Sequence, residues 1–323
     1  MAMGIIPAIM PDENGEIVNG RFVPDNEQYI ISSKEKEANK KAYLRGKENK
    51  ELFEELAGRF TFTLSSTINE LNQDQRFTPA EKTRIMYLGT YVTYQEQGSY
   101  LRHDNGNFIL KNRLQELLEI KNKKEFYNFY NKLVKTGILS EEIEGKSKIY
   151  LKWNSKYHFK GSPSASAQKE KNLIKTFDKQ VRELYKEKNE KGKAVHTPNN
   201  LYTLFMVLPY IHPEANILCK HPENDLNKCE PLTLPELAEM FGFSRSNDLK
   251  KKLFKVMLKG LPVFTIQQNA FVSHILVNPF VVCRSSKAPN PALLVHFRDT
   301  AVRLMTKQGL TGTPDELLTL NKI

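Results

Sequence analysis

The stretch Thr78-Pro79-Ala80-Glu81 begins a pattern that the chain carries twice, the second time from Thr197-Pro198. Each copy continues with aromatic, leucine, glycine and asparagine positions in the same order. In the first copy these are Tyr91, Leu114-x-x-Leu117-Leu118, Gly137 and Trp153-Asn154-Ser155, with Lys160 six residues after the Asn. In the second copy they are Tyr210, Leu237-x-x-Met240-Phe241, Gly260 and Val277-Asn278-Pro279, with Arg284 six residues after the Asn. A repeat of this length indicates a whole small domain made twice, not a solenoid unit.

The composition indicates a folded and strongly basic protein. The 323 residues carry a net charge of +11 at pH 7, with a pI near 9.3 and 40% hydrophobic content. This charge predicts a polyanionic partner, either nucleic acid or an acidic membrane face, although a lysine-rich surface can also serve solubility alone. No run of about 18 apolar residues occurs, so we expect no membrane span. Three cysteines, Cys219, Cys229 and Cys283, suggest no disulfide framework and fit a reducing cytoplasm.

Each copy has the element order of a winged helix-turn-helix domain. Thr78 is the expected N-cap of the first helix, with Pro79 as its first residue. A short strand over 99–101, helices over 110–120 and 121–134, and a hairpin over 138–153 follow. The second copy repeats the order with helices over 197–211, 234–241 and 246–258, a strand over 216–219, and a hairpin over 262–277. We therefore predict a mainly α (α+β) fold with two tandem winged helix-turn-helix domains and an N-terminal hairpin and helix extension.

The segments outside the two copies are predicted from composition and turn signals. Residues 14–31 predict a hairpin that turns at Asn19-Gly20, followed by a charged helix over 33–54 and a second helical stretch over 51–72. Residues 161–166 have the composition of a linker, and 168–190 that of a charged helix. The predicted domains are an N-terminal extension (1–72), winged-helix domain 1 (73–161), a linker and charged helix (162–194), winged-helix domain 2 (195–285) and a C-terminal tail (286–323).

In a winged helix, the third helix presents its exposed side to the major groove of duplex DNA. In the first copy, one side of this helix is apolar and is expected in the core: Phe126, Phe129, Tyr130 and Leu133. The opposite side carries the candidate DNA-binding residues Lys124, Tyr127, Asn128, Asn131 and Lys135. An Asn amide can form two hydrogen bonds with an adenine edge, whereas Lys binds phosphate or guanine.

The third helix of the second copy has the same two-sided pattern. Its expected inward residues are Leu249, Leu253, Val256 and Met257, and its candidate DNA-binding residues are Arg245, Asn247, Lys250, Lys251 and Lys255. Lys146 and Lys148 of the first hairpin are further candidates, and Gln267, Gln268 and Asn269 of the second could reach the DNA backbone. The alternative is that each helix is a solvated basic helix without a ligand.

The segment that ends each hairpin resembles plasmid replication proteins of the RepL type from Gram-positive bacteria and related phage proteins. It comprises Ile149-Tyr150-Leu151-Lys152-Trp153-Asn154-Ser155 with Lys160-Gly161, and Ile275-Leu276-Val277-Asn278-Pro279 with Arg284. The resemblance covers roughly residues 75–161 and, more loosely, 195–285. The first copy has Ser155 where the family has Pro, and the second lacks the final Gly.

The resemblance implies sequence-specific binding of double-stranded DNA by a plasmid or phage replication initiator that recognises origin repeats and recruits host replication proteins. One alternative is a transcriptional regulator of a mobile element, either repressor or activator, that acts on RNA polymerase. A second alternative is a non-enzymatic protein-interaction module. The charged helices over 34–54 and 168–190 could pair two chains as a homodimer or brace the domains.

No sequence pattern indicates an enzyme, a cofactor or a metal. The chain has no Gly-x-x-x-x-Gly-Lys-Ser/Thr loop of an ATPase and no His-x-His pair of a rolling-circle nickase. His212, Cys219, His221 and Cys229 fall within eighteen positions and would be a zinc set, but they lack a close Cys-x-x-Cys pair. We expect separate packing and loop roles for these four residues.

Overall fold

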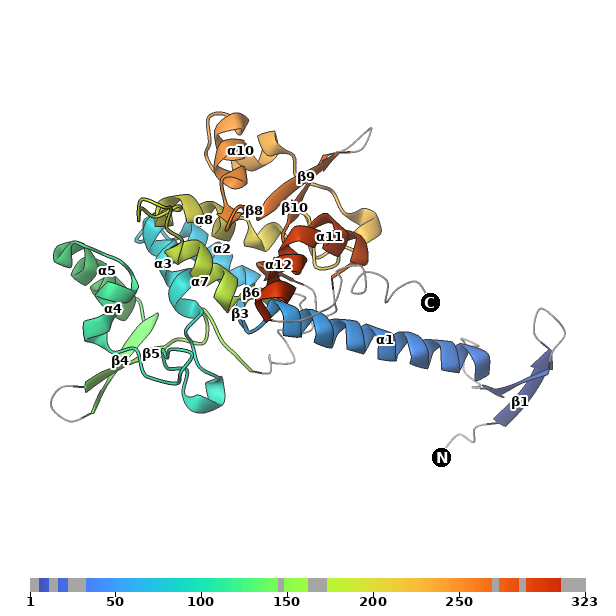
Figure 1. The fold of residues 1–323 in the computed structure, drawn as a ribbon. Coiled ribbons are helices and arrows are strands. Elements are labelled where there is room, and N and C mark those ends of the chain that lie inside the picture. The colour runs from blue at the N-terminus through green and yellow to red at the C-terminus, as the bar shows by residue number, and fades with distance from the viewer. Residues whose placement is uncertain are drawn as a thin grey trace. The chain divides into compact units, whose positions relative to one another are not determined.

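The computed structural model describes residues 6–11, 17–22, 33–144, 148–161, 173–268, 273–284 and 289–308. The chain divides into two compact units, Met1–Leu52 and Phe53–Ile323. The first unit contains the antiparallel strands β1 (Ile6–Pro11) and β2 (Ile17–Phe22) and most of helix α1 (Ser33–Ala57) (Figure 1). The predicted turn at Asn19-Gly20 is wrong, because β2 runs through both residues and pairs them with Ile9 and Ala8.

The second unit contains one element order twice: a strand, four helices and then a hairpin. The first copy consists of β3 (Phe60–Leu64), α2 (Ser65–Gln73), α3 (Pro79–Gly89), α4 (Lys111–Leu117), α5 (Lys123–Lys135), β4 (Leu139–Glu144) and β5 (Lys148–Trp153). The second consists of β6 (Leu173–Phe177), α7 (Asp178–Lys186), α8 (Pro198–Met206), α9 (Leu234–Met240), α10 (Ser246–Phe254), β9 (Phe264–Gln268) and β10 (Ser273–Val277). The repeat is longer than its sequence pattern, because a strand and a helix precede each Thr-Pro pair.

Further elements lie outside the repeated order. They are the 3-10 helices η1 (Gln95–Gln97), η2 (Leu208–Tyr210) and η3 (Leu226–Lys228), the strands β7 (Met257–Leu258), β8 (Leu261–Pro262) and β11 (Val282–Cys283), and the helices α11 (Pro291–His296) and α12 (Arg298–Gln308).

The predicted helix starts at the Thr-Pro pairs are confirmed. Thr78 caps α3 in a reciprocal capping box, in which its side chain accepts from the Glu81 N–H and the Glu81 carboxylate accepts from the Thr78 N–H. Thr197 caps α8 by accepting from the Asn200 N–H. Gly137 follows α5 with a φ of +70°, the left-handed geometry that a glycine adopts without steric cost.

The prediction of a mainly α protein with two tandem winged helix-turn-helix domains is wrong. Helices account for 46% of the structure and strands for 22%, an α+β mixture with several small antiparallel sheets. The copies are also not separate domains, because β3 of the first copy pairs antiparallel with β6 of the second in the sheet β11-β6-β3. Helix α3 packs against α8 across the same boundary.

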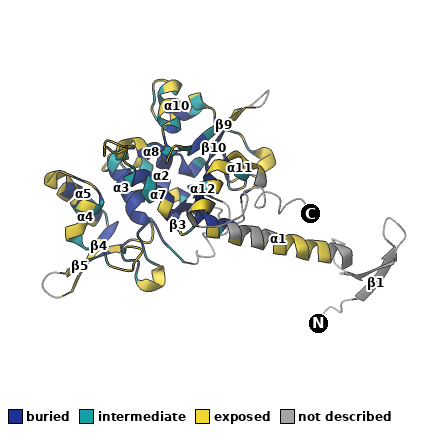
Figure 2. Ribbon diagram, viewed as in Figure 1, coloured by how far each residue is buried: buried dark blue, intermediate teal, exposed yellow. Residues whose placement is uncertain are grey.

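A single hydrophobic core joins the two copies. It includes Leu88 and Phe129 from the first copy and Leu204, Leu253 and Val277 from the second, and each of these residues is fully buried. Figure 2 shows buried segments in the elements of both copies. A smaller cluster gathers Phe53 of α1, Phe177 of β6 and Phe280 under α11 and α12. Because neither copy buries its apolar side chains alone, the two copies form one folding unit.

Several predicted helices differ from the structure, and the one over 197–211 ends at Met206, before η2. The charged helix over 168–190 is wrong at its start, because β6 occupies Leu173–Phe177 as the central, buried strand of the sheet and α7 begins only at Asp178. The helical stretch over 51–72 is interrupted by Gly58 (φ +84°) and by β3. The helix over 246–258 ends at Phe254, because Met257–Leu258 pair with Leu261–Pro262 in a short hairpin.

Among the residues that the structure describes, no helix combines the length and the apolar character that a membrane span requires.

Candidate nucleic-acid interface

Helix α5 has the two sides that its sequence predicts. Phe126, Phe129, Tyr130 and Leu133 are buried. All five candidate DNA-binding residues are exposed on the opposite side: Lys124, Tyr127, Asn128, Asn131 and Lys135 (Figure 2). Their spacing of three, four, seven and eleven residues places them in one stripe along the helix. Asn122 caps the helix by accepting from the Lys124 and Glu125 N–H groups, so the start of the stripe has a fixed backbone.

Acidic residues flank the α5 stripe. Glu81 of α3 accepts two hydrogen bonds from Lys132 Nζ, both at 2.9 Å, and Glu125 pairs with Arg84 at 2.9 Å. Glu81 and Lys132 line one shallow pocket together with Asn128, Asn131 and Lys135 of the stripe. The exposed side of α5 therefore offers hydrogen-bonding groups beside cations that are partly neutralised.

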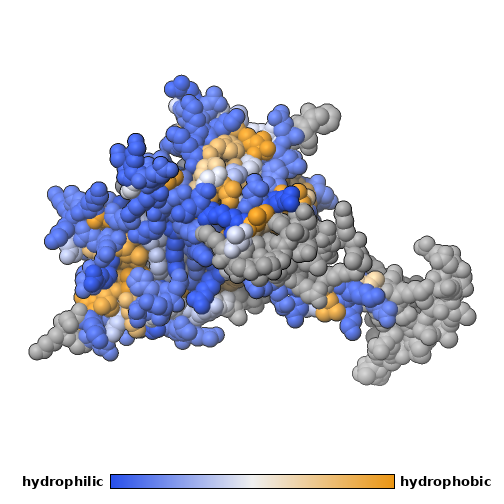
Figure 3. Space-filling model, in the orientation of Figure 1, coloured by the Kyte–Doolittle hydropathy of each residue, from blue (hydrophilic) through white to orange (hydrophobic). Residues whose placement is uncertain are grey.

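Helix α10 presents a more strongly cationic side. Leu249, Leu253 and Val256 are buried, whereas Met257 lies in β7 and is only half-buried. The candidate residues Arg245, Asn247, Lys250, Lys251 and Lys255 are all exposed. Arg245 pairs with Asp248 at 3.6 Å. Within the described part of the chain, Lys250, Lys251 and Lys255 form no ion pair, so their charges remain available to a ligand. Figure 3 shows a hydrophilic surface over α10, with hydrophobic patches below it and at the end of the molecule that bears α5.

The two hairpins differ in charge. Strand β4 carries Glu141, Glu142 and Glu144, and Glu144 lies opposite the candidate Lys148 in the β4–β5 register. Lys148 is exposed, but this pairing weakens it as a phosphate contact; Lys146 lies outside the described residues. The described part of the β9–β10 hairpin has no acidic residue, and its Gln267 and Gln268 are exposed; Asn269 also lies outside the described residues.

The β4 glutamates are engaged by neighbouring side chains. Glu141 accepts from Lys111 Nζ at 2.7 Å and from the Tyr130 hydroxyl, and these hydrogen bonds hold the pKa of Glu141 below its ordinary value. Glu142 accepts from the Tyr100 hydroxyl. The acidic strand therefore stabilises the joint between α5, α4 and the hairpin.

The repeated Asn after each hairpin has a structural role. Asn154 Nδ2 donates to the Gly137 carbonyl at 2.9 Å, and Asn278 Nδ2 donates to the Pro262 carbonyl at 3.1 Å. The Asn154 and Asn278 N–H groups donate to Ile138 and Val263 carbonyls in the same way. Each Asn thus ties the exit of its hairpin to the entrance, which explains why the residue recurs.

The repeated basic residue, six positions later, also acts within the fold. Lys160 Nζ donates to the Thr90 carbonyl at 3.1 Å, and Arg284 Nη1 donates to the Pro209 and Ile211 carbonyls at 2.9 and 2.8 Å. These carbonyls follow the equivalent helices α3 and α8, where a cation stabilises the unpaired carbonyl groups and the helix dipole. The sequence pattern found these residues, but only the tertiary structure reveals that Arg284 is buried, that Lys160 is half-buried and that both bind carbonyl groups after a helix.

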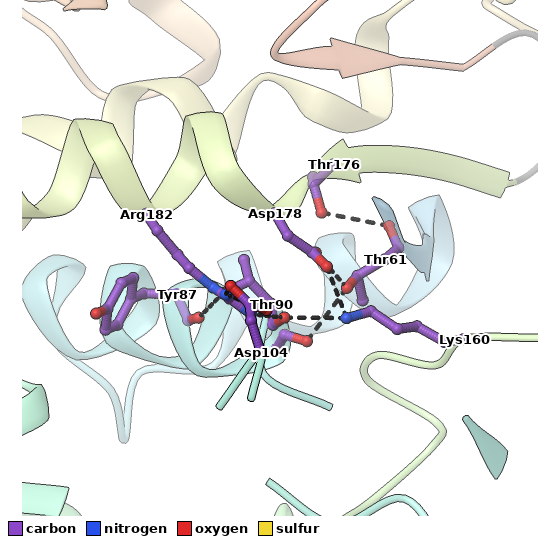
Figure 4. A network of polar contacts seen from close by, with 9 residues as sticks. Thr61, Tyr87, Thr90, Asp104, Lys160, Thr176, Asp178 and Arg182 are labelled. Atoms are coloured by element: carbon purple, nitrogen blue, oxygen red, sulfur yellow. Dashed lines mark hydrogen bonds and ion pairs between the residues drawn. The ribbon is translucent and has the colours of Figure 1, made fainter. Parts of the chain in front are cut away.

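Lys160 belongs to a polar network between the copies (Figure 4). Its ammonium lies 2.6 Å from Asp178 Oδ2, and Asp178 Oδ1 accepts from the Thr61 hydroxyl at 2.7 Å. Burial lowers the pKa of Lys160 and raises that of Asp178, and the opposite charge of the partner counteracts both shifts. Arg182 of α7 extends the network by donating to the Thr90 carbonyl and by binding Asp104 at 2.8 Å.

The four residues that would make a zinc set do not converge. His212 Nε2 hydrogen-bonds the Asn224 carbonyl at 3.1 Å, His221 pairs with Glu223 at the surface, and Cys219 and Cys229 are free thiols that interact with each other. Burial raises the pKa of the Cys219 thiol, which disfavours the thiolate form that metals bind. Within the described residues, no group of three or more His, Cys, Asp or Glu side chains could hold a metal ion.

No family model, curated protein or solved structure matches this chain.

Proposed function

We propose that this protein binds double-stranded DNA in a sequence-specific manner, with α5 and α10 contacting major grooves. The observation that carries the proposal is the exposed side of α10, where Lys250, Lys251 and Lys255 have no ion pair among the described residues and lie opposite a buried apolar side. Three uncompensated cations on one rigid helix favour a polyanion, and a helix fits the width of the major groove.

Helix α5 supports the same function by a different chemistry. Asn128 and Asn131 are exposed side by side on its stripe, next to Tyr127, which is 51% exposed. Amide groups can read adenine edges, and an exposed tyrosine can contact bases or donate to a phosphate oxygen. The two helices together would supply affinity and base recognition.

The biological context of the proposal rests on the sequence resemblance to RepL-type proteins. In that context the protein acts in the bacterial cytoplasm as a plasmid or phage replication initiator. A regulator of transcription would use the same surface. Nuclease footprinting on the DNA element that encodes the protein distinguishes the two, because an initiator protects repeats at the origin and a regulator protects a promoter.

The direct test is the salt dependence of binding to duplexes selected from a random library. Each phosphate contact contributes a slope of about −0.9 in a plot of log K against log salt concentration, so we expect a steep line. Lys250→Ala/Lys251→Ala should weaken binding to all duplexes. The matched control is Lys179→Gln/Lys228→Gln, because both lysines are exposed and form no ion pair among the described residues.

Weak and salt-insensitive retention of every duplex by the unmodified protein would overturn the proposal. Such a result would favour a protein-interaction module. Equal binding by the Lys250/Lys251 variant and the control would show that α10 does not contact the DNA.

A further inference from the structure

A groove with a volume of about 1040 Å³ lies between the two copies. One wall is α4 with the residues that lead into α5, and the other is the end of α7 with the loop to α8. Its lining includes more cationic than acidic side chains: Arg84, Lys121, Lys186, Lys188 and Lys193 against Glu116 and Glu119. The groove is therefore cationic, and none of its residues belongs to the candidate sets on α5 and α10.

The charges of the groove are only partly neutralised inside the fold. Glu119 is shared by Lys186 at 3.3 Å and Lys188 at 3.2 Å, and Arg84 is bound to Glu125. Lys121 and Lys193 are exposed and have no ion pair within the described ranges. These two lysines, one on each wall, are the groove's uncompensated cations.

Lys193 is presented by a well-ordered turn. Asn189 Oδ1 accepts from the N–H groups of Lys191 and Lys193, both at 3.0 Å, and the Asn189 N–H donates to the Lys193 carbonyl at 2.8 Å. Gly192 has a φ of +69°, which the turn requires. The backbone of this turn is fixed by these bonds, so binding a ligand costs little further ordering.

The same loop reaches the end of α10. Glu187 Oε2 accepts from the Lys259 N–H at 3.0 Å, and His196 Nε2 hydrogen-bonds the Met257 carbonyl at 2.8 Å. At the other wall, Lys121 directly precedes Asn122, the cap of α5. In Figure 1 the loop between α7 and α8 is seen between α5 and α10. The groove therefore begins at the residue before the cap of α5, and the loop that forms its other wall is hydrogen-bonded to the residues that follow α10.

We propose that the groove binds the sugar–phosphate backbone of the duplex between the segments that α5 and α10 contact, with Lys121 and Lys193 each bound to a phosphate. This inference rests on the proposed function. Lysine suits the task because its ammonium is a mobile point charge that follows phosphates without regard to base sequence. Because the groove lies beside two helices that are both proposed to contact DNA, the backbone of one duplex is favoured over a separate acidic partner.

The experiment compares Lys121→Gln/Lys193→Gln with the Lys179→Gln/Lys228→Gln control. Lys179 lies at the opposite end of α7 from the groove. We expect the groove variant to bind its selected duplex roughly 10- to 30-fold more weakly at physiological salt, with a salt slope reduced by about two. Hydroxyl-radical footprinting should show lost protection only between the two helix-contacted segments. Circular dichroism and thermal unfolding should match the unmodified protein, because all four lysines are exposed.

The outcomes separate this inference from the proposed function. If the unmodified protein binds duplexes without salt dependence, both are overturned. If Lys250→Ala/Lys251→Ala weakens binding while the groove variant keeps the slope and the continuous protection of the control, the groove inference alone is overturned. A reduced slope with a gap in the middle of the footprint supports it.

Discussion

Helices α5 and α10 hold equivalent places in the two copies, but acidic side chains neutralise the surroundings of α5 more than those of α10. Beside α5, Glu81 binds Lys132 and Glu125 binds Arg84, and the following hairpin begins with a strand that carries three glutamates. Beside α10, Arg245 pairs with Asp248, but Lys250, Lys251 and Lys255 form no ion pair among the described residues, and the described strands of the β9–β10 hairpin have no acidic residue. The first copy is therefore suited to hydrogen-bonded recognition and the second to electrostatic attraction.

Much of this difference comes from a local requirement of helix capping. In the first copy the capping box of α3 needs an acid at its third position, and Glu81 fills it and also reaches Lys132. In the second copy the equivalent cap on α8 uses the Asn200 N–H alone, and no carboxylate is introduced. Glu81, which caps α3, thus also neutralises a lysine of α5.

The largest effect on stability is expected at the repeated basic residue, which is Lys160 in the first copy and Arg284 in the second. Lys160 is paired with buried Asp178, whereas Arg284 binds carbonyl oxygens. Lys160→Met leaves Asp178 buried without its partner and should lower the free energy of unfolding by about 3–5 kcal/mol. Arg284→Met leaves carbonyls unsatisfied and should cost about 1–3 kcal/mol. Urea unfolding measures both.

Lys160→Met/Asp178→Asn is the control for that comparison. Because the second change removes the unpaired charge, the double variant should recover part of the loss. Additive losses, or an equal cost of the Lys160 and Arg284 variants, would contradict the assigned role of the ion pair.

A second difference between the copies predicts a loss of stability in acid that originates at His158 of the first copy. His158 is buried, its Nδ1 accepts from Trp153 Nε1 at 3.2 Å, and burial lowers its pKa to about 3; the second copy has Val282 in the corresponding place, four residues after the Asn. Between pH 6.5 and 3 the unfolded chain binds a proton that the folded chain does not. His158 therefore adds no penalty above pH 6.5, but stability falls as the pH drops below that value.

The expected loss from His158 is about 2 kcal/mol between pH 7 and pH 5. Unfolding of the unmodified protein and of His158→Gln at both pH values isolates this contribution, since other titrating groups are shared. The loss between the two pH values should shrink by about 2 kcal/mol in the variant. An unchanged pH dependence would show that His158 titrates normally.

Double lysine variants of α5 and of α10 test whether the two helices contribute unequally to duplex binding. Lys250→Ala/Lys251→Ala should weaken duplex binding about 30-fold near 0.15 M salt, because two phosphate contacts are lost. Lys124→Ala/Lys135→Ala should weaken it only about threefold, because nearby carboxylates already oppose these cations. Fluorescence anisotropy on one labelled duplex measures both, and equal losses would contradict the division of roles.

The smallest effects concern sequence preference. Asn128→Ala and Asn247→Ala should each reduce discrimination between the selected duplex and a single-base variant by about 1 kcal/mol, with little change in non-specific binding. Repeating the selection with each variant protein identifies the position that loses its preference. A uniform loss on all sequences would assign these residues to phosphate contacts.

The sequence predicted what depends on local periodicity. The apolar side of α5, from Phe126 to Leu133, follows from helical spacing, and so do the Thr78 and Thr197 caps. The exposure of the candidate residues follows from the same spacing. Their DNA contacts stay predictions.

The sequence could not predict what depends on distant partners. Strand β3 alternates Phe and Thr, but five residues between two helices gave no sign that β6 would pair with them. The caps made by Lys160 and Arg284 depend on a helix end about seventy residues earlier, at a distance that no local pattern encodes. The predicted helix over 168–190 runs into the Lys193 turn, whose residues Asn189 and Gly192 are of the types that favour turns.

Because β3 of the first copy pairs with β6 of the second, the two copies cannot fold separately. A fragment that ended before β6 would expose an open sheet edge and half of the joint core, and it should aggregate when produced alone. Two fragments divided within residues 162–172 should instead recover a soluble fold when produced in one cell, since each supplies the strand that the other lacks. The molecule is thus a natural candidate for fragment complementation, and neither half can be transplanted as a module.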